Sequence, residues 1–259
     1  MNALLRANLR GARLIVHLCT GLLLVLAVTV YPRLSREKLT RWWNGRLLTI
    51  LHVRVRRVGR RGPGPQLIVC NHISWLDISV LASVELTRFV SKAEVGKWPI
   101  AGALANAAGT FYIRRGAGGT KQLIQAIAKH LRDGGSATVF PEGTTTEGGR
   151  MLKFQPRLFA AAIESGTPVQ PIALRYGLAA NGENIAAFVG EETLTHNLRR
   201  LLKERELEVE LHYCEPLQPQ AGQDRAGLAQ AAHAAICAVV APGSLPAEGP
   251  AETPESLAA

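Results

Sequence analysis

The segment Leu67–Asp77 most constrains how this chain can fold. Four apolar residues, Leu67 to Cys70, contain no charge and predict a buried strand. The polar residues Asn71 to Ser74 then interrupt the run and are of the types that begin helices. From Trp75 to Val84, apolar residues recur at helical spacing. The segment therefore predicts a strand, a tight turn and a helix in direct succession.

His72 and Asp77 lie on the two sides of this predicted turn. In a continuous helix, residues five positions apart would point about 140° apart. With His72 in the turn and Asp77 one turn into the helix, the carboxylate can reach back to the imidazole. Such a carboxylate orients a histidine general base and stabilises its protonated form. The alternative is a surface histidine at a helix start, followed by an aspartate that the helix dipole favours.

Positive charge is concentrated in the first 61 residues of this 259-residue chain, whose net charge is +10. Those residues hold 13 Lys and Arg against one acidic residue, Glu37, a net charge of +12. The remainder holds 17 basic and 19 acidic residues, a net charge of −2. The folded part thus has no basic excess, and we expect no nucleic-acid partner.

The basic segment contains an apolar run of 17 residues, Leu14–Val30, which is the short limit for a membrane span. Basic residues on both sides leave its orientation open. A cleaved signal peptide is the alternative, but Tyr31–Arg33 offers no small-residue cleavage site. Trp42 and Trp43 follow in an amphipathic pattern typical of membrane interfaces. We expect residues 1–61 to form an anchor that spans the membrane or dips into it, and that holds the domain at an anionic membrane surface.

Beyond the anchor, apolar strands alternate with helical segments, which predicts an α/β domain over residues 62–241. Its sheet should be mostly parallel or mixed and flanked by helices. The sequence 242–259, rich in Pro, Glu, Ser and Ala, should be a disordered tail. Strands are expected at 53–58, 67–70, 87–91, 111–113, 137–140, 169–174 and 208–212, with a weaker candidate at Ile185–Val189. Helices are expected at 75–84, from 98 to before 109, and at 120–131, 158–163 and 223–240.

The four cysteines show no paired spacing: Cys19, Cys70, Cys214 and Cys237. This pattern suggests neither a disulfide framework nor a zinc site, and we expect no metal. It is typical of a reducing compartment.

Polar clusters follow three of the predicted strands: His72 with Asp77, Arg114–Arg115, and Glu142–Thr144. Each cluster alone has an ordinary structural interpretation, because adjacent arginines often form a solvated turn and Pro-Glu-Gly is a common loop sequence. An α/β sheet, however, brings the ends of neighbouring strands together in one crevice. Three clusters at strand ends therefore indicate a single active site.

Four sequence blocks and one linking segment carry a family resemblance that covers about residues 65–176. They are Asn71–Asp77 (N-H-x-x-x-x-D), Gly109–Arg115, Phe140–Thr144 and Val169–Ala173, with Ser91–Glu94 between the first two. In this order they resemble the glycerophospholipid acyltransferases, which include 1-acylglycerol-3-phosphate acyltransferase. A lone H-x-x-x-x-D is a weak signal, but the four blocks in order are a strong one.

The resemblance implies a mechanism and a set of site residues. His72 would take the proton from a lysolipid hydroxyl, which attacks an acyl thioester directly, while Asp77 holds the imidazole. No covalent enzyme intermediate is then expected. Arg115 and Lys92 are suited to an anionic head group. The complete set of implied substrate-binding residues is Asn71, Ser74, Lys92, Arg115, Glu142, Gly143 and Thr144.

The resemblance also implies the partners. The acyl donor would be acyl-CoA or acyl carrier protein, without a further cofactor, and the enzyme would work among membrane lipids on the cytoplasmic face of a bacterial inner membrane. The acceptor would be 1-acylglycerol-3-phosphate, giving phosphatidic acid. Many members with that activity have an arginine after Glu-Gly-Thr, where this chain has Thr145. The alternative acceptor is therefore lyso-ornithine lipid or another lysophospholipid.

Two other functions compete with acyl transfer. A non-catalytic membrane-binding protein would need only the basic N-terminus, and the intact His72 and Asp77 argue against it. A thioesterase would use the same base on water, and acyl release without a lysolipid acceptor would reveal it.

Overall fold

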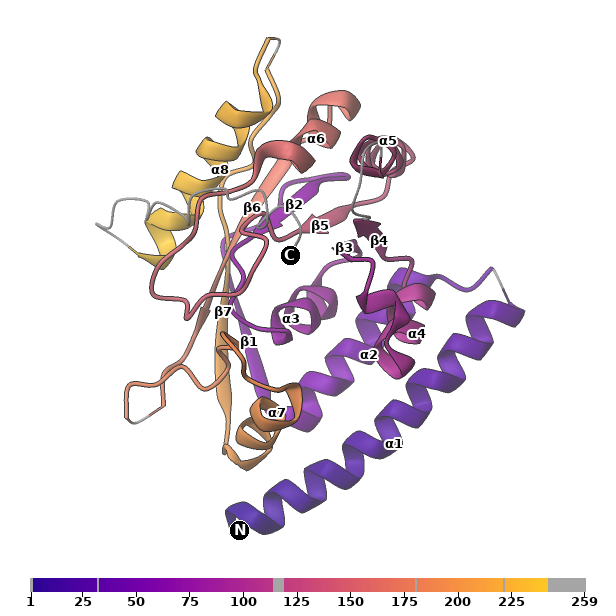
Figure 1. Cartoon of the computed structure of the whole chain (residues 1–259), viewed down its shortest axis with the longest axis vertical. Coiled ribbons are helices and arrows are strands. Elements are labelled where there is room, and N and C mark those ends of the chain that lie inside the picture. Colours follow the sequence, from indigo (N-terminus) through magenta and orange to yellow (C-terminus); the bar gives the residue numbers. More distant parts are fainter. Residues whose placement is uncertain (1, 32, 114–118, 180, 221, 242–259) are drawn as a thin grey trace.

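The computed structural model describes residues 2–31, 33–113, 119–179, 181–220 and 222–241. They form a seven-stranded mixed sheet in the order β1-β7-β6-β2-β5-β3-β4, in which β6 and β7 are antiparallel and the other neighbours parallel. The α/β sheet flanked by helices is therefore confirmed (Figure 1). The strands are β1 (Val53–Val58), β2 (Leu67–Cys70), β3 (Arg88–Lys92), β4 (Phe111–Ile113), β5 (Ala137–Val139), β6 (Val169–Tyr176) and β7 (Leu207–Tyr213).

Helices cover both faces of the sheet. The α-helices are α1 (Ala3–Val30), α2 (Arg36–Leu51), α3 (Leu76–Val84), α4 (Pro99–Ala107), α5 (Gly119–Arg132), α6 (Ala160–Ser165), α7 (Leu194–Lys203) and α8 (Arg225–Val240), and the 3-10 helices are η1 (Val95–Lys97) and η2 (Pro156–Phe159). Side chains of α2, α3 and α7 pack in one core cluster, and those of α5, α6 and α8 in a second. The sheet therefore lies between two helical layers.

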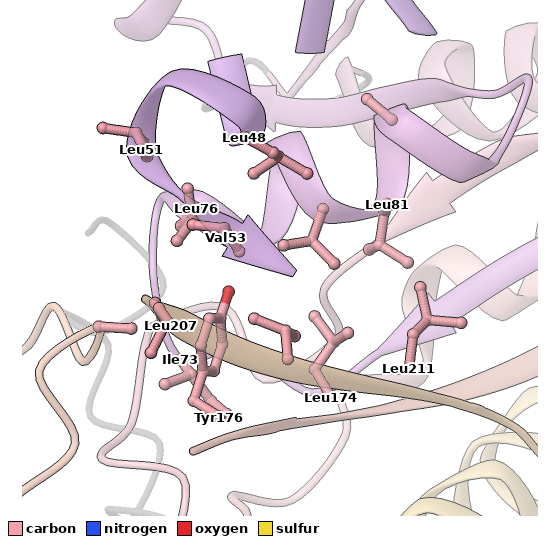
Figure 2. Close-up of a cluster of buried hydrophobic side chains, with 14 of the residues drawn as sticks. Leu48, Leu51, Val53, Ile73, Leu76, Leu81, Leu174, Tyr176, Leu207 and Leu211 are labelled. Atoms are coloured by element: carbon pink, nitrogen blue, oxygen red, sulfur yellow. The ribbon is translucent and has the colours of Figure 1, made fainter. Parts of the chain in front are cut away.

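Strand β2 lies in the middle of the sheet, as its uninterrupted apolar sequence predicts. It pairs in parallel with both β5 and β6, and its side chains are fully buried. Leu67 and Val69 enter the core beneath α5, α6 and α8, whereas Ile68 and Cys70 enter the core beneath α2 and α3. A strand buried on both faces needs this continuous apolar run. Asn71 and His72 directly follow its carboxyl end, in the middle of the sheet. Part of the core beneath α2 and α3 is drawn in Figure 2.

The first helix, α1, lies along the outside of the domain and contacts α2, α4 and α7 (Figure 1). Near its start, the buried guanidinium of Arg10 donates hydrogen bonds to the carbonyl oxygens of Leu202 (3.2 Å) and Arg205 (2.9 Å) at the end of α7. Further along, the ring of His17 stacks on Trp43 of α2 with the ring centres 4.3 Å apart. Both halves of α1 are thus attached to the folded domain.

The prediction of a weaker strand at Ile185–Val189 is wrong. Those residues form turns and irregular backbone, because the side chain of Asn197 and the turn after β2 make hydrogen bonds with their backbone groups. The Asn197 amide donates to the carbonyl of Ala187 (3.0 Å), and the Phe188 N–H donates to the carbonyl of Ile73 (2.9 Å). The expected tail, 242–259, lies outside the described residues. Strand β1 belongs to the sheet through β7, and the boundary placed after residue 61 stays a prediction.

Candidate active site

The predicted contact between His72 and Asp77 is present. The Nδ1 atom of His72 lies 2.8 Å from Oδ2 of Asp77, whose side chain is completely buried. The same oxygen accepts the backbone N–H groups of Ile73 (2.7 Å) and Ser74 (2.9 Å). Asp77 therefore stabilises the turn and fixes the ring of His72.

The imidazole ring of His72 is fixed by a stacking contact on its face as well as by the hydrogen bond at Nδ1. It stacks on Phe140, with the ring centres 4.1 Å apart, and about a fifth of its side chain (18%) is exposed. With an Nδ1–H donated to Asp77, the Nε2 atom carries the free lone pair. The arrangement leaves one basic nitrogen to accept a proton from a bound hydroxyl group.

Asn71 joins the turn to the neighbouring strand. Its side-chain amide donates to the carbonyl of Leu174 (3.0 Å) and accepts the N–H of the same residue (2.8 Å). Strand β2 ends at Cys70, opposite Ile172 of β6. Asn71 thus continues the strand pairing with its side chain while its backbone turns away. Its polar atoms serve this clamp, and it is 1% exposed.

Glu142 connects the turn to the loop that follows β5. Its Oε1 accepts the backbone N–H of His72 (2.7 Å), and its Oε2 accepts the N–H of Leu152 (2.8 Å). Burial raises the pKa of this carboxyl to about 7, although the hydrogen bonds from Leu152 and His72 act in the opposite direction. Glu142 therefore holds the site together through its backbone contacts and titrates close to neutral pH.

The remaining predicted site residues have different environments. Ser74 is fully buried, and its hydroxyl accepts the N–H of Leu76 (3.3 Å). Gly143, at a φ of 75°, and Thr144 are exposed in the turn after Glu142. Lys92 is exposed at the carboxyl end of β3. Because β2, β5 and β3 are parallel, this is the end of the sheet at which β2 and β5 also terminate. Arg114 and Arg115 lie outside the described residues.

Two side chains that contact the pair were absent from the predicted site. The hydroxyl of Tyr176 donates to Oδ1 of Asp77 over 2.7 Å, and Phe140 stacks on His72. Phe140 immediately precedes Pro141-Glu142, so its position at the end of a predicted strand was a usable signal. Tyr176 is 99 residues from Asp77 along the chain, and the sequence contains no local pattern that joins them.

Comparisons with known proteins place this chain in a family. The family model described as Acyltransferase matches residues 52–175. A lyso-ornithine lipid O-acyltransferase of Pseudomonas aeruginosa is 42% identical over 241 residues, which cover 90% of this chain and 93% of that protein. This chain belongs to the glycerophospholipid acyltransferase family. It is an acyltransferase that acts on lysolipids.

Other members of the family differ in the acceptor that their names state. A 1-acyl-sn-glycerol-3-phosphate acyltransferase of Neisseria gonorrhoeae is 30% identical over 180 residues, covering 69% of this chain and 71% of that protein. The crystal structure of the 1-acyl-sn-glycerophosphate acyltransferase of Thermotoga maritima superposes with a TM-score of 0.67 over 92% of this chain and 94% of that one. At 20% identity, this second likeness concerns the fold.

The raised pKa of Glu142 predicts a pH dependence of stability. The unfolded carboxyl ionises from its ordinary value of 4.5 upward and the folded one from about 7. The folded state thus binds this proton more tightly, so the group's contribution is fully present below pH 4.5 and is lost as the pH rises through 7. We expect it to lower the free energy of unfolding by about 2 kcal/mol between pH 5 and pH 8.

Thermal unfolding of the purified protein at these two pH values measures this contribution, with Glu142→Gln as the variant that cannot ionise. The loss of Tm between pH 5 and pH 8 should be several degrees larger in the wild type than in the variant. Glu183→Gln, on an exposed carboxylate, is the matched control and should behave like the wild type. Equal losses in wild type and Glu142→Gln would contradict the prediction.

Proposed function

We propose that this chain transfers a fatty acyl group from an acyl thioester to the hydroxyl of lyso-ornithine lipid. The observation that carries the choice of acceptor is Thr145, which places a neutral side chain directly after Glu-Gly-Thr. The similarity to the Pseudomonas aeruginosa protein, over nearly the whole of both chains, supports it. The acceptor 1-acylglycerol-3-phosphate, to which the sequence blocks first pointed, stays a prediction and is the competitor in the test below.

The reaction follows from the free Nε2 of His72. This nitrogen accepts the proton of the lysolipid hydroxyl while the oxygen attacks the thioester carbonyl carbon. Asp77 stabilises the imidazolium that forms. The tetrahedral intermediate then breaks its carbon–sulfur bond, and the leaving thiolate takes the proton back from Nε2. The products are the acylated lipid and a free thiol of acyl-CoA or acyl carrier protein, and His72 returns to its neutral form.

Thr145 lies in the loop after β5 and is connected to the turn that carries His72 through Phe188. Its hydroxyl donates a hydrogen bond to the carbonyl of Phe188, and the N–H of Phe188 donates to the carbonyl of Ile73. The backbone of the 184–188 segment is thereby fastened to the turn that carries His72. A neutral, internally bonded side chain at position 145 lacks the charge that would attract a phosphate dianion. The head group of ornithine lipid has no phosphate.

A competition assay tests this assignment. Purified protein receives an acyl thioester with equal amounts of lyso-ornithine lipid and 1-acylglycerol-3-phosphate, and the products are identified by mass spectrometry. We expect the wild type to acylate mainly lyso-ornithine lipid. Thr145→Arg should shift the product ratio toward phosphatidic acid by about tenfold, the kinetic equivalent of a modest charge-assisted hydrogen bond.

Thr145→Val is the matched control, because it removes the bond to Phe188 without adding charge. It should keep the preference of the wild type, so that a shift in Thr145→Arg alone reports the cation. A wild type that already forms mainly phosphatidic acid would overturn the proposed acceptor. Acyl release without either lipid product would instead indicate a thioesterase.

We further propose that α1 lies in the membrane plane. In the described residues, only Ala3–Val30 is long and apolar enough to cross a membrane. With about 100° per residue, its buried residues fall on one face, and its exposed apolar residues occupy a roughly 140° arc opposite them. The buried residues are Arg10, His17, Gly21 and Val28. The exposed apolar residues are Leu4, Leu5, Leu9, Ile15, Val16, Leu22, Leu23, Leu26 and Val30.

The arginines of α1 support this in-plane placement. Arg6 and Arg10 lie on the side of α1 that faces the domain, and the exposed Arg13 lies at the flank of that side, roughly 60° from Arg10 around the helix. Arg6 and Arg10 donate to backbone carbonyls at the end of α7. A helix fastened along the domain in this way presents an uncharged apolar face, which suits burial in one leaflet.

A further inference from the structure

Tyr176 stands at the end of β6, beside the catalytic turn. Strand β6 continues for four residues beyond Ile172, the residue opposite the end of β2. The Asn71 amide fixes Leu174 on one side of this extension, and Tyr176 pairs with Val209 of β7 on the other. Leu174 and Tyr176 are two residues apart and therefore lie on the same face of the strand, as Figure 2 shows. The backbone beneath the phenol ring is thus held from both sides.

The phenol of Tyr176 reaches the carboxylate oxygen that the turn leaves open. The donors His72 Nδ1, Ile73 N and Ser74 N all converge on Oδ2 of Asp77. In the part of the chain that the structure describes, the donor to Oδ1 is the Tyr176 hydroxyl, at 2.7 Å. Asp77 is completely buried and Tyr176 is 8% exposed. Because Asp77 is completely buried, water does not reach Oδ1, and the Tyr176 hydroxyl supplies the hydrogen bond that this oxygen needs.

We propose that Tyr176 is a positioning residue for acyl transfer, which acts on His72 through Asp77. The inference rests on the proposed role of His72 as the general base. By binding Oδ1, the hydroxyl fixes the plane of the carboxylate and therefore the direction in which Oδ2 meets the imidazole. It also stabilises the negative charge of Asp77, and so limits how tightly the His72–Asp77 pair holds a proton.

The electrostatic surroundings support a permanent donor. Burial, followed by the charge of the adjacent Asp77, raises the pKa of Tyr176 well above its ordinary value. The phenol therefore keeps its proton at neutral pH. The other titratable groups that face the pair are Glu142, from the loop after β5, and the buried thiol of Cys70 on β2. Burial also raises the pKa of Cys70 well above its ordinary value, so that it stays neutral.

Tyr176→Phe removes the hydroxyl and keeps the ring in the core. We expect kcat to fall about ten- to a hundredfold, the equivalent of one hydrogen bond to a charged group, while the KM of the lysolipid acceptor stays unchanged. Without the donor at Oδ1 the pair binds its proton more tightly. The acidic limb of the kcat/KM profile should therefore move to higher pH. A purely structural role would not move this limb.

Tyr213→Phe is the matched control. Tyr213 also ends a strand and donates to a carboxylate, Oε1 of Glu85, over 2.6 Å, but Glu85 follows the far end of α3 from Asp77. This variant should keep the wild-type kcat and pH profile. Glu142→Gln should be assayed alongside, because Glu142 accepts the backbone N–H of His72 and has a pKa raised by burial to about 7. The shift caused by Tyr176→Phe should persist in the Glu142→Gln background.

A double-mutant cycle decides whether Tyr176 acts through Asp77. In an Asp77→Asn background, Tyr176→Phe should have little further effect on kcat, because the interaction it removes is already lost. Full additivity, or a wild-type kcat in Tyr176→Phe, would overturn the inference. All assays use whichever lysolipid the wild type acylates fastest, so the acceptor assignment does not enter. An active His72→Ala would instead show that the proposed base is wrong.

Discussion

Replacing His72 by alanine should lower kcat/KM for acyl transfer about a thousandfold. General-base catalysis by a positioned side chain is worth roughly 10² to 10⁴ in rate. A value well above the lower limit of that range applies because a lipid hydroxyl is a weak nucleophile before it loses its proton. The variant should still fold, since His72 lies in a turn, its backbone N–H can still donate to Glu142, its side chain is partly exposed, and Asp77 keeps the N–H groups of Ile73 and Ser74. Lipid products quantified by mass spectrometry measure the loss.

His212→Ala is the matched control for this variant. His212 is likewise a partly buried histidine with a carboxylate partner, since its Nε2 lies 2.8 Å from Oε2 of Glu210, but it belongs to β7 and its carboxylate partner is on the same strand. It should keep wild-type turnover. Near-normal acyl transfer by His72→Ala, in a host without background acyltransferase activity, would refute the mechanism.

Asp77→Asn should also lose most activity, but for a different reason from His72→Ala, because this variant keeps the imidazole and loses the carboxylate that supports it. The amide cannot stabilise the imidazolium as a carboxylate does, and its NH₂ group would face either Tyr176 or the N–H groups of Ile73 and Ser74. The turn itself is therefore strained in this variant. Its thermal unfolding should be compared with that of His72→Ala, so that lost catalysis and lost structure are told apart.

Local sequence was sufficient to predict the centre of the site. The apolar run Leu67–Cys70 and the polar break after it define a strand and a turn without reference to the rest of the chain. His72 and Asp77 are five residues apart, so their contact follows once the turn is located. The mixed sheet followed from alternating strand and helix patterns. The antiparallel pairing of β6 with β7 did not, because pairing direction depends on where distant segments meet.

Contacts between distant segments set the rest of the site. Tyr176 reaches Asp77 because β6 extends past β2, and the length of that extension becomes clear only when the strands are paired. The sequence marked Glu142 as part of the site, but its two bonds to backbone N–H groups depend on how the loop up to Leu152 folds. Ile185–Val189 has strand-like composition, yet contacts with Asn197 and Ile73 hold it in an irregular path.

Replacing Leu22, Leu23 and Leu26 of α1 together by aspartate should release the protein from membranes. These side chains lie on the uncharged face of α1 and are 43%, 66% and 59% exposed. Burying a leucine completely is worth about 1.5–3 kcal/mol, so roughly half of that applies to each. The three substitutions should weaken membrane partitioning at least about a hundredfold, before the added cost of placing carboxylates in lipid.

Flotation of the purified protein with vesicles measures this partitioning. High salt should release little of the wild type, because ions screen charge attraction but leave apolar burial in place. Leu178→Asp, at an exposed leucine outside α1, is the control and should stay bound. An in-plane α1 also leaves cysteines placed at Asn2 and Leu34 open to a membrane-impermeant thiol reagent from the same side. Labelling from opposite sides would show instead that α1 spans the bilayer, and release of the wild type by salt alone would show that charge holds it there.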